Sequence, residues 1–325
     1  MRGADGFGRY VEALLEEMER RKEEQRHPIR TVYFGGGTPS ILPVLELARI
    51  VEGLRRCFDL SALVEMTIEA NPEDLSPEYL ESLQQLGFNR ISIGVQSLDD
   101  KILRLLNRRH TAQQAIEAVD NAHKAGFDNI SVDFIYGLPG DFRFPTFNVK
   151  SVTHVSAYAL TIEPGTALAV QVEQGRVVLP DDDEVVRQYY TLHERLEAAG
   201  FRQYEVSNYA RPGYESKHNS RYWDRTPYLG LGPGAHSFDG KKRVWNNPDG
   251  SVGEETLDAA DAYNEMLMTA LRTVRGLPAA EVSGRQKEQL QPYLDCSWLV
   301  LKDGFYCPTT EGLLHADGMA ASLFV

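Results

Sequence analysis

The first two hundred residues alternate between short apolar runs and segments in which apolar side chains recur at helical spacing. Residues 10–26 place Tyr10, Leu14 and Met18 on one face of a helix, and residues 30–34 then form a predicted buried strand. Further strands are predicted at residues 65–70, 90–95, 129–135, 154–160 and 203–207, and further helices at 43–58, 77–86, 111–125 and 183–199. This alternation indicates a parallel sheet, either curved into an open barrel or doubly wound.

Two regions depart from this alternation. Residues 141–153 join two predicted parallel strands with a proline in the middle and no helical period, although such a crossover usually contains a helix, so the connection looks shortened. From about residue 258 we predict a helix at 259–275, a mixed segment at 290–301 and, after a capping Thr309, a helical segment that runs to residue 324. We expect a small, mainly helical, winged-helix-like domain there.

Composition and charge narrow the class of protein. The chain has 325 residues and a formal net charge of -13, which repels a phosphate backbone and argues against nucleic acid as a partner. No apolar run approaches the roughly 18 residues of a membrane span, and the first residues lack the apolar core of a signal peptide, so we expect a cytoplasmic protein. The cysteines Cys57, Cys296 and Cys307 are too scattered for a disulfide framework or a CxxC metal site.

Three glycines follow the first predicted strand, in the segment Gly35-Gly36-Gly37-Thr38-Pro39. Such a segment lets the backbone approach a ligand closely and offer it N–H and C=O groups. It is neither GxGxxG nor a phosphate loop, which favours a small charged ligand over a nucleoside triphosphate. A tight glycine turn without a ligand is the alternative.

Polar side chains occur in the next three predicted strands: Glu69 ends the first, Gln96 ends the second, and Asp133 lies within the third. The carboxyl ends of parallel barrel strands meet at one rim, where the active sites of such folds are found, so these residues form a candidate ligand site. Arg108 could pair with a ligand carboxylate. The alternatives are a cap for each acidic side chain and a solvated charge at a helix end for Arg108.

The segment His218-Asn219-Ser220-Arg221-Tyr222-Trp223 brings an imidazole and two large aromatic rings together. Imidazole is a ligand of haem iron, and aromatic faces can pack on a macrocycle. A hydrogen-bonded structural histidine is the alternative. Glycines at 230, 232 and 234 then form another close-approach loop or a flexible turn.

Ordered motifs over most of the chain resemble the HemW branch of the radical S-adenosylmethionine (SAM) coproporphyrinogen oxidase superfamily. They are YFGGGTPSIL, TIEANPEDL, ISIGVQSLDDKILRLLNRRH, VDFIYGLPG, AYALTIEPGTAL, EVSNYA, HNSRYW, YLGLGPGAHS and EGLLHADGMAA. The resemblance implies an α/β fold, a partial (β/α)6 radical SAM barrel with SAM along the strand ends. It implies that Gly36, Gly37 and Thr38 recognise the methionine part of SAM, and that the rest of the site is lined by Glu69, Gln96, Arg108, Asp133 and Thr161.

The resemblance also implies haem and an iron–sulfur cluster. In this family the HNxxYW pattern marks the haem-binding branch, which implies His218 as the candidate iron ligand beside Asn219, Tyr222 and Trp223. The family holds a 4Fe-4S cluster through CxxxCxxC after its first barrel strand, and this sequence contains neither that strand nor that motif. We expect both to be missing from the sequence rather than from the natural protein; the alternative is a truncated form without redox chemistry.

Three functions stay open at this point. HNxxYW favours a haem chaperone that passes haem to a haem-requiring protein, which could lie at a membrane. An oxygen-independent coproporphyrinogen III oxidase would instead use a SAM-derived radical to decarboxylate porphyrinogen propionates, and a cluster-free interaction protein would bind neither ligand. We expect the barrel at residues 1–210, a connecting segment with the haem motif at 211–257 and the C-terminal domain at 258–325. Whether the chain forms a homodimer stays open as well.

Overall fold

The structure is a computed structural model that describes residues 4–140 and 151–325. Its centre is a seven-stranded sheet in the order β1-β2-β3-β4-β5-β7-β6. The parallel part consists of β1 Thr31–Phe34, β2 Glu65–Ala70, β3 Arg90–Gln96, β4 Ile130–Tyr136 and β5 His154–Ala159. The predicted parallel α/β sheet is therefore confirmed. Most of the shortened connection, residues 141–150, lies outside the described residues.

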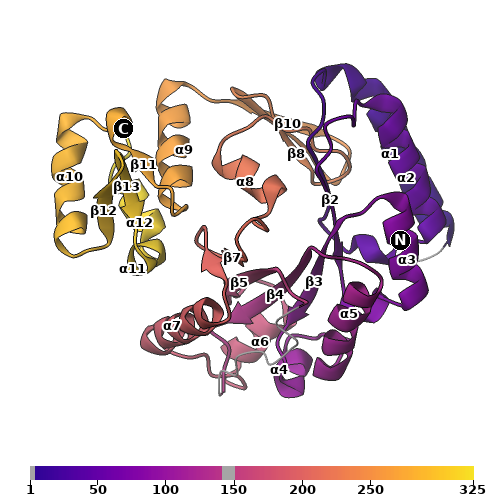
Figure 1. Ribbon diagram of the computed structural model, residues 1–325, viewed down its shortest axis with the longest axis horizontal. Coiled ribbons are helices and arrows are strands. Elements are labelled where there is room, and N and C mark those ends of the chain that lie inside the picture. The colour runs from indigo at the N-terminus through magenta and orange to yellow at the C-terminus, as the bar shows by residue number, and fades with distance from the viewer. Residues whose placement is uncertain (1–3, 141–150) are drawn as a thin grey trace.

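Helices cover one face of this sheet (Figure 1). They are α1 Ala4–Arg21, α2 Val44–Cys57, α3 Pro77–Leu86, α5 Ala112–Lys124 and α7 Asp182–Ala198, which all contribute to the main core, whereas the short helices α4 Asp100–Leu105 and α6 Ala167–Glu173 do not. Polar caps define several starts: Ser76 accepts from the backbone N–H of Tyr79, and Thr111 forms a capping box with Gln114. Short 3-10 helices follow at Lys22–Glu24, Pro39–Ile41 and Pro72–Asp74.

The parallel strands separate apolar from polar side chains, because successive residues of a strand point to opposite faces. One set, which includes Ile68, Ile91 and Val132, packs with the helices in the main hydrophobic core. The alternate set faces away from these helices and is mostly polar, with Gly94 and Ile135 as exceptions; we call its polar members the polar face. Its members are Thr31, Tyr33, Glu65, Thr67, Glu69, Arg90, Ser92, Ser131, Asp133, His154 and Ser156. Polar groups in this number are typical of a sheet face that binds a ligand.

The predicted strand at residues 203–207 is wrong. The structure has two short strands instead, β6 Arg202–Gln203 and β7 Asn208–Ala210, which pair antiparallel with each other. β7 pairs antiparallel with β5, so the sheet changes direction at this edge. The chain reverses around the buried Glu205, whose carboxylate accepts a hydrogen bond from the Asn208 amide.

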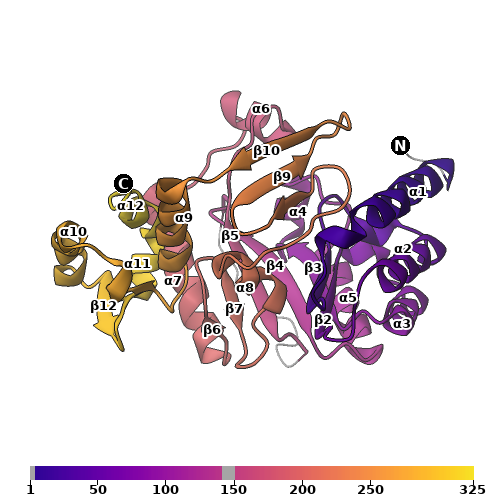
Figure 2. The same ribbon diagram turned by 90° about the horizontal axis from the view of Figure 1, so that it is seen from above.

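The segment after the sheet contains structure that the sequence did not predict. Helix α8, Lys217–Trp223, carries the HNxxYW residues, and β8 His236–Phe238, β9 Lys242–Asn246 and β10 Val252–Thr256 form an antiparallel sheet. β9 and β10 make a hairpin that Figure 2 shows from above. In Figure 1, α8 lies between the central sheet and the C-terminal helices.

The C-terminal part has its own small core around Leu267, Leu290 and Met319. It comprises helices α9 Ala259–Leu271, α10 Gly284–Asp295, α11 Thr310–Leu314 and α12 Ala316–Ala321, a 3-10 helix at Ala279–Glu281, and the strands β11 Leu277–Pro278, β12 Leu299–Lys302 and β13 Phe305–Pro308. The expected helical segment after Thr309 is broken into two helices at His315. In both Figure 1 and Figure 2 this part lies at the end of the molecule away from α1 and α3.

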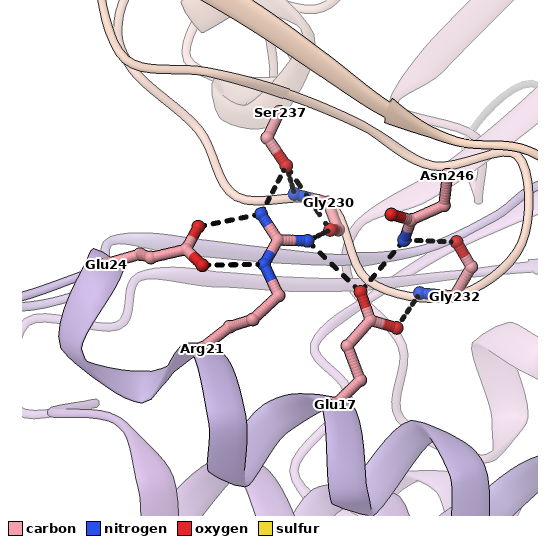
Figure 3. Close-up of polar contacts among 7 residues, drawn as sticks. All are labelled: Glu17, Arg21, Glu24, Gly230, Gly232, Ser237 and Asn246. Atoms are coloured by element: carbon pink, nitrogen blue, oxygen red, sulfur yellow. Dashed lines mark hydrogen bonds and ion pairs between the residues drawn. The ribbon is translucent and has the colours of Figure 1, made fainter. Parts of the chain in front are cut away.

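A polar network joins α1 to the glycine loop before β8 (Figure 3). The guanidinium of Arg21 donates to the carbonyl of Gly230 at 2.9 Å and to the hydroxyl of Ser237 at 3.1 Å. Glu17 accepts from the backbone N–H of Gly232 and from the side-chain amide of Asn246, at 2.9 and 2.8 Å. The loop is therefore a fixed part of the fold rather than a flexible turn.

Candidate functional site

The three glycines after β1 have three different environments. A Cβ on Gly35 would lie 2.4 Å from the Tyr33 ring and 2.9 Å from the Glu69 carboxylate, so no side chain fits there. Gly36 has a φ of +103°, a conformation that favours glycine. Open space faces both Gly36 and Gly37, where nothing lies within 4 Å of an added Cβ. Gly35 thus accommodates the protein's own side chains, while Gly36 and Gly37 leave backbone open to a ligand.

Glu69 lies beside this turn, near the end of β2. Its carboxylate accepts a 2.6 Å hydrogen bond from the Tyr33 hydroxyl and one from the backbone N–H of Gly36. Burial raises the pKa of Glu69, and the nearby Asp133 raises this pKa further, against the effect of those hydrogen bonds. Burial and the Glu69 charge also raise the pKa of the Tyr33 phenol, so Tyr33 stays a hydrogen-bond donor at any physiological pH.

Asp133 lies on β4, two strands away from Glu69. The Ser92 hydroxyl lies 3.1 and 3.3 Å from its two carboxylate oxygens, and Ser156 hydrogen-bonds it from the other neighbouring strand. Burial raises the pKa of Asp133, while the hydroxyls and the charges of Arg90 and Arg108 oppose that rise. Arg108 is exposed, but its charge acts on this carboxylate.

Gln96 and Thr161 complete the set of SAM candidates. Gln96 ends β3 with a φ of 65°, which is uncommon for a residue other than glycine, and the pairing of β3 with β4 shifts register just before it. Its side-chain amide nitrogen lies only 2.9 Å from the position that a Cβ on Gly94 would take, so the missing side chain of Gly94 makes room for it. Thr161 is exposed, two residues after the end of β5. A hydrogen bond joins Glu69 to Gly36, and Asp133 lies near enough for its charge to act on Glu69, whereas no described contact links Thr161 to them.

Arg90 was not predicted as a site residue. It begins β3 on the polar face, is only 1% exposed, and its Nε has no hydrogen-bond partner in the described part of the chain. Its charge acts on the carboxyls of Glu69 and Asp133 and on the imidazole of His218. The sequence did contain a signal for Arg90, because it is a charged residue in a strand whose polar and apolar side chains alternate.

His218 on α8 also lies against the polar face. Its Nδ1 is 3.0 Å from the Thr31 hydroxyl, its Nε2 is 3.0 Å from the Tyr222 hydroxyl, and its ring stacks on that of Tyr33 with 4.9 Å between centroids. Burial lowers the pKa of His218 to about 4, although Glu65 acts to raise it, so the imidazole is neutral at pH 7.

Glu65 fixes the start of α8. Glu65 is the first residue of β2 and is 1% exposed. Its carboxylate accepts hydrogen bonds from the backbone N–H groups of Lys217 and His218, each at 2.9 Å. Ser216 adds a side-chain cap to the N–H of Asn219. The haem-motif helix is therefore attached to the same sheet that carries the SAM candidates, which sequence spacing could not reveal.

The remaining haem-motif side chains differ in exposure. Tyr222 is 41% exposed, Asn219 is half-buried, and the indole Nε1 of Trp223 is buried without a hydrogen-bond partner among the described residues. The guanidinium of Arg272, the residue that follows α9, lies 5.5 Å from the centroid of the Trp223 ring. Trp223 thus joins α8 to the C-terminal part, while Tyr222 faces solvent.

The chain's residues fit two of the three expected groups. Carboxylates, open glycine backbone and a strand-end amide suit SAM, and a neutral imidazole with Nδ1 held by a hydroxyl suits haem iron. A 4Fe-4S cluster does not fit: Cys57 ends α2, Cys296 and Cys307 lie in the C-terminal part, and the described residues contain no group of three side chains that could hold a metal ion.

The fold and this site define a radical SAM-type barrel protein. The Radical SAM superfamily model matches residues 3–143. The structure also matches the Escherichia coli coproporphyrinogen III oxidase HemN, a radical SAM enzyme, with a TM-score of 0.82 over 100% of this chain and 85% of that chain. At 20% sequence identity this match shows the fold alone. No helix in the described residues combines the length and apolarity that crossing a bilayer requires.

Sequence relatives then define the family. The chain is 37% identical to the heme chaperone HemW of Mycobacterium tuberculosis, over 97% of this chain and 86% of the relative. It is 33% identical to heme chaperone HemW of Escherichia coli, over 88% and 81% of the two chains. A mitochondrial radical SAM domain-containing protein 1 from Bos taurus is 37% identical over 78% of this chain. The chain belongs to the HemW heme chaperone family.

Proposed function

We propose that this chain binds haem and transfers it to a haem-requiring protein. The observation that carries the proposal is the environment of His218: a neutral imidazole, held at Nδ1 by Thr31 and stacked on Tyr33, whose Nε2 points toward the partly exposed Tyr222. The names of the HemW relatives agree with it. Among the described histidines, His154 is fully buried between Ser131 and Tyr204 and is a poor candidate for binding a large ligand.

A simple exchange would convert this histidine into an iron ligand. In the tautomer with its proton on Nδ1, His218 donates to the Thr31 hydroxyl, and Nε2 accepts the Tyr222 hydroxyl proton. Rotation of the Tyr222 side chain would free the Nε2 lone pair while Thr31 keeps the ring oriented. Haem, when bound, would supply the iron, and Tyr222 and Trp223 would supply apolar ring surface beside it.

The test is a titration of haem into the chain and into the variant His218→Ala, followed by the Soret band. We expect one haem per chain for the unaltered protein and a weakened or shifted spectrum for His218→Ala. His123→Ala is the matched control, because His123 is exposed on α5 and should not change the spectrum. Haem binding that is identical in the unaltered chain and His218→Ala would refute His218 as the ligand, and no binding at all would refute the proposed function.

We further propose that SAM binds at the strand ends, with Gly36, Gly37 and Thr38 on its methionine part. Glu69, Gln96, Asp133, Arg108 and Thr161 would contact the remainder. The open backbone at Gly36 and Gly37 supports this assignment. Calorimetric titration with SAM tests it, since Glu69→Gln should weaken binding, whereas Glu52→Gln on the exposed side of α2 should not.

The division into parts is also a proposal. Residues 1–210 would hold SAM, residues 211–257 would present haem, and residues 258–325 would form a separate C-terminal domain. The central sheet ends at Ala210 and a second core surrounds Leu267, which supports these bounds.

We place the protein in the cytoplasm, because its described cysteines are free thiols. A haem-accepting protein is the expected partner; size-exclusion chromatography distinguishes a monomer from a homodimer.

A further inference from the structure

One short strand, β1, contacts both candidate ligand sites. Its polar-face residues Thr31 and Tyr33 both contact the His218 imidazole. The Thr31 hydroxyl lies 3.0 Å from Nδ1, and the Tyr33 ring stacks on the imidazole with an interplanar angle of 19°. The strand then continues directly into the glycines of the SAM candidate site. At about 3.3 Å per residue, roughly 17 Å of extended chain separates Thr31 from Gly36.

Tyr33 makes the connection at the level of a single side chain. Its hydroxyl donates to Glu69 at 2.6 Å, and its ring stacks on His218 at 4.9 Å. The ring packs beside Gly35, whose missing side chain makes room for it, since an added Cβ would lie 2.4 Å from the ring. A change in how Glu69 is held therefore acts on the ring that positions the imidazole.

We propose that Tyr33 is a positioning residue that couples SAM binding at the strand ends to haem binding at His218. This inference rests on the proposed function and adds regulation to it. SAM that contacts Glu69 fixes the acceptor of the Tyr33 hydroxyl, and the fixed ring then holds His218 in its ligating position. The cost of ordering these side chains is met by the first ligand, so the second binds more tightly.

The experiment is a haem titration of the full chain with and without saturating SAM, repeated for Tyr33→Phe. Phenylalanine keeps the stacked ring and removes only the hydroxyl bonded to Glu69. Tyr79→Phe is the matched control, because Tyr79 lies on α3 and its hydroxyl bonds the Leu42 carbonyl rather than Glu69 or His218. A calorimetric titration of SAM with and without haem gives the reciprocal measurement.

We expect SAM to tighten haem binding about fivefold in the unaltered chain and in Tyr79→Phe, and to have no effect in Tyr33→Phe. Haem should tighten SAM binding by the same factor, since thermodynamic coupling is reciprocal. A general loss of structure in Tyr33→Phe would weaken each ligand alone, but it would not selectively abolish the effect of one on the other.

The proposal is overturned if the unaltered chain binds both ligands independently, or if Tyr33→Phe keeps the full coupling. Both results leave the proposed function intact, because haem still binds at His218. A chain that binds no haem refutes the proposed function and this coupling together. The two failures are therefore distinguishable by the titration without SAM.

Discussion

The attachment of α8 to the sheet by Glu65 can be tested by replacing its carboxylate with an amide. Glu65→Gln keeps the shape of the side chain, but its NH2 group then faces one of the two backbone N–H groups that the carboxylate accepts. A hydrogen bond to a charged group contributes about 1.5–3 kcal/mol, and an N–H left without an acceptor adds a desolvation cost. Because Glu65 is only 1% exposed, water cannot replace the lost acceptor.

We therefore expect Glu65→Gln to lower the free energy of unfolding by about 2–3 kcal/mol, measured by urea denaturation. Amide hydrogen exchange should accelerate across α8. Haem affinity should fall about tenfold if the displaced His218 loses about 1.4 kcal/mol of binding free energy. Glu52→Gln, an exposed residue on α2, serves as the control for loss of one charge. An unfolding free energy within about 0.5 kcal/mol of the unaltered chain, with unchanged exchange in α8, would refute this role of Glu65.

Three further variants test other parts of the site. Gly35→Ala should lose about 1–3 kcal/mol of stability and weaken SAM binding, because the added Cβ overlaps Tyr33. Gly37→Ala faces open space and should keep the native melting temperature, so equal melting temperatures for the two variants would contradict the glycine assignments. Because burial lowers the folded-state pKa of His218 to about 4, its contribution to stability is full above about pH 6.5 and is lost as the pH falls toward 4. His218→Asn should therefore flatten the plot of unfolding free energy against pH in that window, and an unchanged plot would argue against a buried neutral imidazole. Arg21→Ala should cost about 1–2 kcal/mol and speed proteolysis of the loop that contains Gly230, unlike Arg20→Ala, whose side chain is exposed; equal cleavage rates would contradict the network of Figure 3.

Local pattern was sufficient to predict the parallel strands and most of the helices that cover them. The predicted bounds of β2 and α3 agree with the structure, because alternating side chains and a Ser-Pro helix start are local signals. The strand expected at residues 203–207 failed because its pairing depends on β5, some fifty residues earlier. The β8–β10 sheet escaped prediction because β10 is mostly exposed and lacks a clear apolar face.

The candidate site could be predicted only in part. The position of Glu69 follows from the rule that parallel strands end at one rim, and Glu69 does lie at the glycine turn, whereas Asp133 lies in the middle of β4. The partners of His218 could not be found in this way. Thr31, Tyr33 and Glu65 are between 150 and 190 positions away in sequence and are brought to α8 only by tertiary folding.

The network between α1 and the glycine loop bears on the order in which the chain folds. Arg21 and Gly230 are 209 positions apart, and Glu17 and Asn246 are 229 apart. Contacts of such sequence separation form slowly, because a long loop must close first, and during synthesis they must wait for the ribosome to reach Asn246. Until then Glu17 and Arg21 have only each other and Glu24 as charged partners, all within residues 17–24. The sheet can therefore assemble co-translationally before residues 230–246 are joined to α1.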